Sequence, residues 1–277
     1  MYQATPKQSA PEPGPQAIHH EWRTAENSAT YVQSKLRSMK ELKPNLTLLD
    51  VGAGSGTISI TFAKAIPKGL VTAIDLNPDI LTRAATVADS EGVTNIKFQQ
   101  ADAYKLPFAD ETFDITHCHQ VLCHLKAPWG VLREMLRVTK PGGILAAREG
   151  DLETECVWPE LPGLLRFHRL AVDIIKIGGG STNAGRQLLS WALKAGAKRE
   201  QATATFGTWC YSERADKDAW AQGIIKMVGA GRVHDLALKM GLATEDELVG
   251  MGKAWQEWQE TDDATLGMLH GEILIQK

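Results

Sequence analysis

The chain has 277 residues, of which 43% are hydrophobic and 23% are charged, so it can bury the core of one large domain, with or without a sizeable insertion. Its formal net charge of −3 disfavours a protein that binds nucleic acid or an anionic membrane surface. No apolar run reaches the ~18 residues of a transmembrane helix, and the four cysteines are sparse, so we expect a reduced, cytoplasmic protein with no membrane segment.

The N-terminal segment is polar and rich in proline. Residues 1–17 contain no apolar signal-peptide core, and their composition predicts a disordered leader, because such a segment cannot bury enough apolar surface to fold. Residues 18–277 are predicted to form a single domain, which begins with a polar helix between His20 and Met39.

Short apolar runs then alternate with helical stretches up to residue 150. The predicted strands are 46–51, 70–75, 96–100, 113–118 and 144–149, and the predicted helices between them are 57–65, 78–90 and 128–138. Strands and helices that alternate at this spacing predict an α/β fold with a mostly parallel sheet.

The pattern changes after Asp151. Residues 155–199 are predicted to be mainly helical, 202–209 to form a strand, 213–258 to be helical again, and 268–275 to form a last strand. We interpret two helical regions, about 155–199 and 213–262, as elements that cover a substrate bound on the first half.

The clearest functional motif is LDVGAGSG, residues 49–56, where the first predicted strand passes into a helix. Its three glycines allow a tight turn and let a ligand approach bare backbone, and Asp75, at the end of the second strand, is placed to accept the hydroxyls of a ribose. The spacing differs from the G-x-G-x-x-G dinucleotide fingerprint. Asp50 at the start of the loop would repel a pyrophosphate but suits an ammonium group, which favours S-adenosylmethionine (SAM) over NAD.

Further motifs follow at the ends of the next strands. Five motifs occur in the order LDVGAGSG, AIDLNPDIL, ADAYKLPFADETFD, HQVLCHL and LRVTKPGG. With these motifs the sequence resembles the class I SAM-dependent methyltransferases over residues 20–150. It is most similar to the ubiquinone/menaquinone-biosynthesis-type branch of small-molecule enzymes. The resemblance implies a Rossmann-like, seven-stranded, mostly parallel sheet whose last strand is antiparallel. The helical segment before the final strand departs from the family pattern, so the substrate does not carry over.

The resemblance also implies where SAM binds. Gly52 and Gly54 would meet its methionine part, Asp75 the ribose, Leu76 the face of the adenine, and Asp102 the adenine amino group. The residues that we assign to the cofactor are Asp50, Gly52, Gly54, Gly56, Asp75, Leu76, Asp102, Ala103, His119 and Gln120.

Three histidines and two cysteines crowd residues 117–124, which suggests a metal site. Strand geometry argues against it, because successive side chains point to opposite faces and Cys156 and Cys210 are isolated, so we predict no metal. His119 and Gln120 leave the fourth strand beside the expected cofactor. His119 is the candidate general base, and the alternative is that its ring only shapes the pocket.

Five residues are candidates for the substrate pocket or its lid: Trp22, Arg23, Tyr31, His124 and Arg148. The first three lie on the helix before the first strand, where an aromatic ring could approach a sulfonium or could simply anchor the helix. His124 could instead be a structural residue at a helix entry, and Arg148 could form a surface salt bridge.

Together these observations predict SAM-dependent transfer of a methyl group to a small-molecule acceptor, with S-adenosylhomocysteine (SAH) as product, in secondary or quinone-like metabolism. The alternatives are an NAD(P)-dependent oxidoreductase and a non-methylating SAM-binding protein on the same fold. We expect a small-molecule substrate, no nucleic-acid or membrane partner, and a monomer or homodimer.

Overall fold

The computed structural model describes residues 22–277, so the predicted leader at 1–17 and the start of the first predicted helix lie outside the described part. The described chain opens with two helices, α2 (Ala25–Ser28) and α3 (Thr30–Leu42). Thr24 caps α2 through a hydrogen bond from the Asn27 backbone N–H to its side chain. No helix within residues 22–277 is long and apolar enough to cross a membrane.

Five parallel strands form the first half of the sheet, in the order β3-β2-β1-β4-β5. The elements are β1 (Thr47–Val51), α4 (Thr57–Ala65), β2 (Leu70–Asp75), α5 (Pro78–Ser90), β3 (Ile96–Gln100), β4 (Phe113–His119), the short 3-10 helix η1 (Leu122–His124), α6 (Pro128–Val138) and β5 (Thr139–Gly150). The predicted α/β class with a mostly parallel sheet is therefore confirmed.

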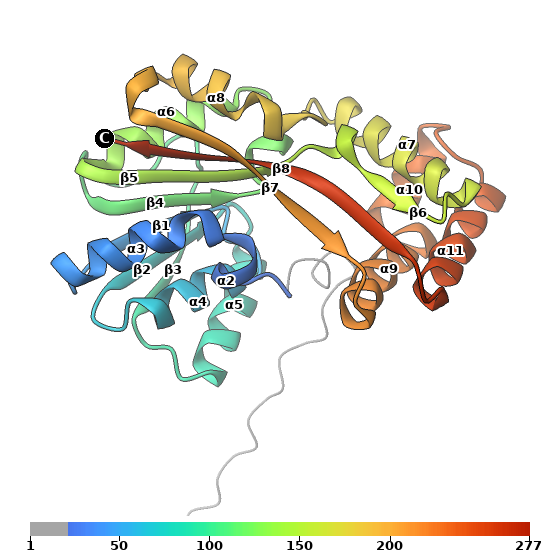
Figure 1. The fold of residues 1–277 in the computed structure, drawn as a ribbon, viewed down its shortest axis with the longest axis horizontal. Helices are drawn as coiled ribbons and strands as arrows, with labels where there is room; N and C mark the ends of the chain where they lie inside the picture. Colours follow the sequence, from blue (N-terminus) through green and yellow to red (C-terminus); the bar gives the residue numbers. More distant parts are fainter. Residues whose placement is uncertain (1–21) are drawn as a thin grey trace, which may run out of the picture.

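Helices cover both faces of this sheet (Figure 1). Leu48 packs into a cluster with α2, α3 and α4, whereas the next residue, Leu49, packs into a cluster with α6 and α8 (Ala184–Ala195), because side chains alternate between the faces of a strand. The ends of β1 and β4 are thereby fixed between two apolar layers.

The second half adds one long antiparallel strand, β8 (Thr265–Gln276), with a partner on each edge. β5 pairs with one edge of β8, and β7 (Ala202–Tyr211) pairs with the other edge. A short strand, β6 (Cys156–Trp158), continues along the edge that β5 occupies. The sheet therefore has eight strands rather than the seven expected, and its last strand is antiparallel as expected.

Two local predictions differ from the structure. β6 lies in a region predicted to be helical, and Pro159 explains this, because the residue before a proline disfavours the helical conformation. β5 begins at Thr139 rather than at residue 144, since the Gly142 N–H and the Gly143 carbonyl already pair with the backbone of Lys277.

The remaining helices gather at the far end of β7 and β8 (Figure 1). They are α7 (Pro162–Ile177), α9 (Arg214–Gly229), α10 (Arg232–Lys239) and α11 (Glu245–Glu260). They share an apolar cluster with the two strands, whose largest members include Trp209, Trp255 and Trp258. The predicted helical segment between the last two strands is thus present as α9, α10 and α11, beside the carboxyl ends of the parallel strands.

Candidate functional site

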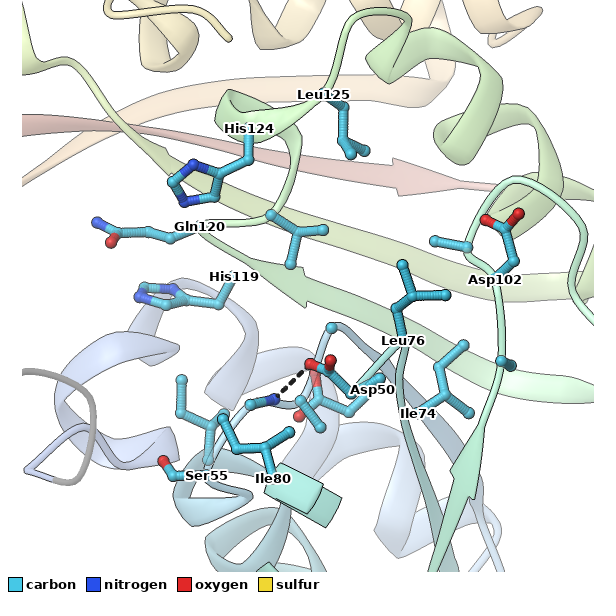
Figure 2. Close-up of a pocket in the computed structure, with 18 of the residues that line it drawn as sticks. Asp50, Ser55, Ile74, Leu76, Ile80, Asp102, His119, Gln120, His124 and Leu125 are labelled. Atoms are coloured by element: carbon cyan, nitrogen blue, oxygen red, sulfur yellow. Dashed lines mark hydrogen bonds between the residues drawn. The ribbon is translucent and has the colours of Figure 1, made fainter. Parts of the chain in front are cut away.

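A cavity of about 420 Å³ opens at the carboxyl ends of the parallel strands, the edge at which open α/β sheets bind ligands. Of the residues predicted to bind the cofactor, nine line it: Asp50, Gly52, Gly54, Asp75, Leu76, Asp102, Ala103, His119 and Gln120. Figure 2 shows His119, Gln120 and His124 at one end and Asp102 at the other, with Asp50 and Leu76 between them.

The glycine loop is held against β2. The N–H groups of Gly52 and Ala53 both donate to the carbonyl of Ile74, at 2.8 Å each. Gly52 has a positive φ of 72°, and a Cβ there would collide with Val121. Gly54 also has a positive φ, 54°, and has nothing within 4 Å of where its Cβ would lie. The loop therefore presents bare backbone to the cavity.

Gly56 has a different role from the one predicted. It does not line the cavity, and a Cβ on it would lie 2.7 Å from the Cβ of Ala84 and 3.1 Å from the ring of Phe98. With φ at 78°, it is the N-cap of α4 and lets that helix pack closely against α5 and β3. Its assignment to cofactor binding is corrected to a packing role.

Asp75 is fixed by two backbone donors. One carboxylate oxygen accepts a hydrogen bond from the Gly54 N–H and the other from the Asn77 N–H, each at 3.0 Å. Each oxygen keeps a lone pair for another donor. Asp75 can therefore accept two hydroxyl groups of a ligand without reorienting.

Asp50 is buried and bonded on both oxygens. Oδ1 lies 2.8 Å from Nδ1 of His117, and Oδ2 accepts from the Ser59 hydroxyl at 2.5 Å. The sheet register places residue 50 opposite residue 117, which explains why the two side chains meet. Within residues 22–277 no group of three His, Cys, Asp or Glu side chains is arranged to hold a metal ion.

An apolar slot with one carboxylate forms the other end of the cavity. Leu76 is 70% exposed although it is a large apolar residue, and it stands across from Asp102 in the view of Figure 2. The Asp102 carboxylate accepts from the Tyr104 N–H at 2.8 Å, which fixes its orientation. A flat aromatic group with an amino substituent fits these two features.

His119 is buried, and neither ring nitrogen has a partner among the described residues. Burial, reinforced by the positive charges of Arg23 and Arg148, holds the pKa of His119 well below its usual value. The ring is therefore neutral at neutral pH, with one nitrogen free to donate and the other free to accept a hydrogen bond. Gln120 follows with a positive φ of 52°, and its side-chain nitrogen lies 3.0 Å from Nε2 of His270.

Glu149 organises this turn, a role that the sequence analysis did not assign to it. Its carboxylate is fully buried at the end of β5 and accepts from the N–H groups of Val121 at 2.9 Å, Leu122 at 2.8 Å and Cys123 at 3.1 Å. Burial raises the pKa of Glu149, and the three N–H donors act against that rise. The available signal was an acidic residue at the carboxyl end of a buried strand.

A second cavity, of about 770 Å³, lies under the helices of the second half. Apolar side chains of α7, α9 and α10 form most of its wall, and Arg23 and His124 line both cavities. The ring of His168 also lines it, with Nδ1 3.1 Å from the Glu155 carboxylate. The sequence analysis did not single out His168 or Glu155, because their pairing depends on how α7 packs.

The other three predicted substrate residues do not line either cavity. Trp22 packs edge-on against Trp209 at 5.4 Å, and the Tyr31 ring lies 6.5 Å from that of His117. Arg148 forms a buried ion pair with Glu272 at 3.2 Å, rather than a surface one. In this structure these residues support the walls of the site and do not reach its space.

Comparison with known proteins agrees with this geometry. Residues 42–170 match a family model described as a methyltransferase domain. The chain is 33% identical to an uncharacterized methyltransferase of Schizosaccharomyces pombe, over 93% of this chain and 92% of the relative. It is 31% identical to the ubiquinone/menaquinone biosynthesis C-methyltransferase of Bdellovibrio bacteriovorus, over 58% and 63% of the two chains.

A solved structure shares the fold at much lower identity. Phosphoethanolamine N-methyltransferase 2 of Haemonchus contortus, in complex with S-adenosyl-L-methionine, superimposes with a TM-score of 0.52 at 16% identity, over 88% of this chain and 52% of that one. This similarity concerns the arrangement of the sheet and its helices.

Proposed function

This chain belongs to the methyltransferase family and is a SAM-dependent enzyme, and from that premise we propose that it methylates a small-molecule acceptor and releases SAH. The observation that supports this best is the convergence of residues from four of the five motifs on one cavity at the carboxyl edge of the sheet. The NAD(P)-dependent alternative has no support from the family comparison.

The residues of the first cavity fit SAM. We propose that the bare backbone at Gly52 and Gly54 receives the methionine part, that Asp75 holds the ribose, and that Leu76 and Asp102 hold the adenine. The negative charge of Asp50 lies behind the loop and favours a cationic group there. When bound, SAM supplies an activated methyl group on a sulfonium.

The protein's main task is then alignment. A nucleophile held in line with the methyl carbon at near-attack distance reacts faster because its translational and rotational entropy is already lost. Glu149 fixes the turn at residues 120–123 through three hydrogen bonds, so His119 and Gln120 face the cavity in one arrangement. We propose that these two residues bound the methyl-transfer site.

The acceptor site is proposed to be the second cavity, because Arg23 and His124 connect it to the first. A quinone-like acceptor is one candidate, since one relative is named a ubiquinone/menaquinone biosynthesis C-methyltransferase. The single-domain arrangement proposed for residues 18–277 would let the helical elements cover both ligands together.

The test has two steps. First, SAH at ~100 times its Kd should add about 2.7 kcal/mol to the free energy of unfolding and raise Tm, whereas NAD should not. Second, incubation with SAM and candidate metabolites should give a product heavier by one methylene group. SAH binding with SAM left intact by every acceptor would instead favour a non-methylating SAM-binding protein.

A further inference from the structure

Arg23 carries a buried charge with no counter-ion. Its side chain is 5% exposed, its Nε has no hydrogen-bond partner, and no ion pair joins it to any residue in the range 22–277. Burial lowers the pKa of Arg23 to about 10, so the guanidinium remains positive at neutral pH. A buried charge without a partner is costly, and such groups are normally paired.

Neighbouring groups do not neutralise this charge. Glu149 is a buried carboxylate whose charge acts on Arg23, but its oxygens already accept hydrogen bonds from three backbone N–H groups. Arg148 is a second positive charge nearby and is paired with Glu272. Arg23 packs over the face of Trp209, with its guanidinium carbon 4.9 Å from the ring centroid, which orients the group but adds no anion.

The position of Arg23 identifies where the missing anion would lie. Arg23 and His124 are the polar side chains shared by the two cavities, so the guanidinium stands at the junction between them. The second cavity contains one acidic side chain, Glu155, and that carboxylate is bonded to His168. The junction is therefore electropositive and open to a ligand from either side.

Apart from Arg23, His124, Glu155, His168 and Arg232, the side chains that line the second cavity are apolar or glycine. Side chains of α7, α9 and α10, among them Phe167, Ile174, Ile224 and Met227, face a volume of about 770 Å³, within the usual range for small-molecule sites. Such a wall favours a large apolar body and offers few hydrogen bonds along its length.

We propose that the methyl acceptor is an amphipathic organic anion, whose apolar body fills the second cavity and whose oxyanion pairs with Arg23 beside the methyl donor. The oxyanion is a carboxylate or a phenolate-like oxygen. This inference rests on the proposed function and adds to it the charge and shape of the substrate.

The same guanidinium could instead pair with the carboxylate of SAM, and the experiment separates the two sources. Protein saturated with SAH is titrated with three fluorescent probes that share an apolar body: 1-pyrenebutyrate, 1-pyrenebutanol and 1-pyrenebutylamine. Fluorescence anisotropy should give an affinity for the acid at least ~10-fold above that for the alcohol, and weakest binding for the amine, since a charged hydrogen bond contributes strongly.

Variants test whether Arg23 is the residue that favours the acid probe over the alcohol. Arg23→Gln should abolish the preference for the acid, and Arg23→Lys should retain part of it. Ala171→Phe places a larger side chain on α7 in the second cavity. It should weaken the binding of all three probes equally and leave the affinity for SAH unchanged. Equal binding of acid and alcohol by the native protein would overturn the proposal.

A second pair of titrations tests the cofactor. If Arg23 pairs with the carboxylate of SAM, Arg23→Gln should weaken the binding of SAH but not of 5′-methylthioadenosine, which lacks the amino-acid part. The preference for the acid probe should then survive in the variant. That result also overturns the proposal. If the native protein fails to bind SAH at all, the proposed function fails instead, which is a separate outcome.

Discussion

At the scale of single residues, Asp75 gives the sharpest test of cofactor binding. Two backbone N–H groups orient its carboxylate toward the cavity. Asp75→Ala should remove the charged hydrogen bonding to the ribose, a loss of ~1.5–3 kcal/mol in total, and should weaken SAH binding ~10- to 150-fold. Calorimetry measures this, and Asp79→Ala, an exposed carboxylate in the first turn of α5, is the matched control. Native-like affinity in a folded Asp75→Ala protein would contradict the assignment.

His119 tests whether the site contains a general base. Because burial and two arginines keep the pKa of its ring well below 6.5, the neutral ring is a weak base, and we expect it to shape the pocket. His119→Ala should then raise KM more than it lowers kcat, and the native rate should not change between pH 6.5 and 8.

Single-turnover kinetics at saturating substrate provides the measurement. A loss of ~10²–10⁴-fold in the maximal rate, with SAH affinity intact, would show that the ring is the base after all. His234→Ala is the control, since that histidine pairs with Asp235 and Glu245 and lines neither cavity.

Residues of the first cavity were predictable because their roles are local. A glycine loop after a strand, or an acidic residue where a strand ends, can be recognised without knowing the rest of the fold. Gly56 was assigned to the ligand because the contact that requires a glycine there is with Ala84 and Phe98, both distant in sequence. The role of Glu149 could not be predicted for the same reason, since its hydrogen-bond partners lie 26 to 28 residues away in the sequence.

At the scale of elements, Asp114 ties the amino ends of β1, β4 and β5 to the carboxyl end of α3. Its carboxylate bonds to Lys43 at 2.7 Å, to the Thr47 N–H and hydroxyl at 2.8 Å, and to Lys140 at 3.2 Å. Burial alone would raise the pKa of Asp114, but these donors outweigh it and lower the pKa to about 2.

A lowered pKa has a definite consequence for acid stability. The hydrogen bonds and ion pairs of the Asp114 carboxylate, called here the Asp114 clamp, stabilise the folded state fully above the unfolded pKa of ~3.9. This contribution to the free energy of unfolding, about 2 kcal/mol, is lost as the pH falls through about 2. Urea titrations should show that Asp114→Asn destabilises the protein by about this amount at pH 7 and much less at pH 2. Asp110→Asn, an exposed partner of Arg137, should change little; equal effects of the two variants would contradict the clamp.

Elements of the first half were predicted most closely where two local signals coincide. Helix α5, for example, has an apolar face and also begins with Asn77 as its cap and Pro78 in its first turn. Strand β6 has neither signal: Pro159 disfavours a helix there, but its three residues form a strand because β8 extends beyond β5 to pair with them. Such pairing depends on tertiary structure and is not visible locally.

At the scale of the whole molecule, the two halves of the chain divide the proposed work. The parallel strands carry the first cavity, which we propose binds the cofactor. Helices α7, α9 and α10 enclose the second cavity. The segment before β1 links them, because Arg23 lies at the junction while Ala25 and Ala29 are fully buried against the sheet layer. The covering helices could be predicted, but not their cavity, whose shape arises from the packing of α7 against α9 and α10.

Truncation tests this link. Deletion of residues 2–16, which are polar and proline-rich, should leave Tm and SAH affinity unchanged, because terminal segments without apolar anchors contribute little to stability. Deletion through Ala29 should lower both, since it removes Ala25 and Ala29, which are fully buried in one cluster with α4, the helix that follows the glycine loop. Thermal unfolding and calorimetry on the two shortened chains give the comparison. Loss of SAH binding in the shorter deletion alone would show that the leader takes part in the site.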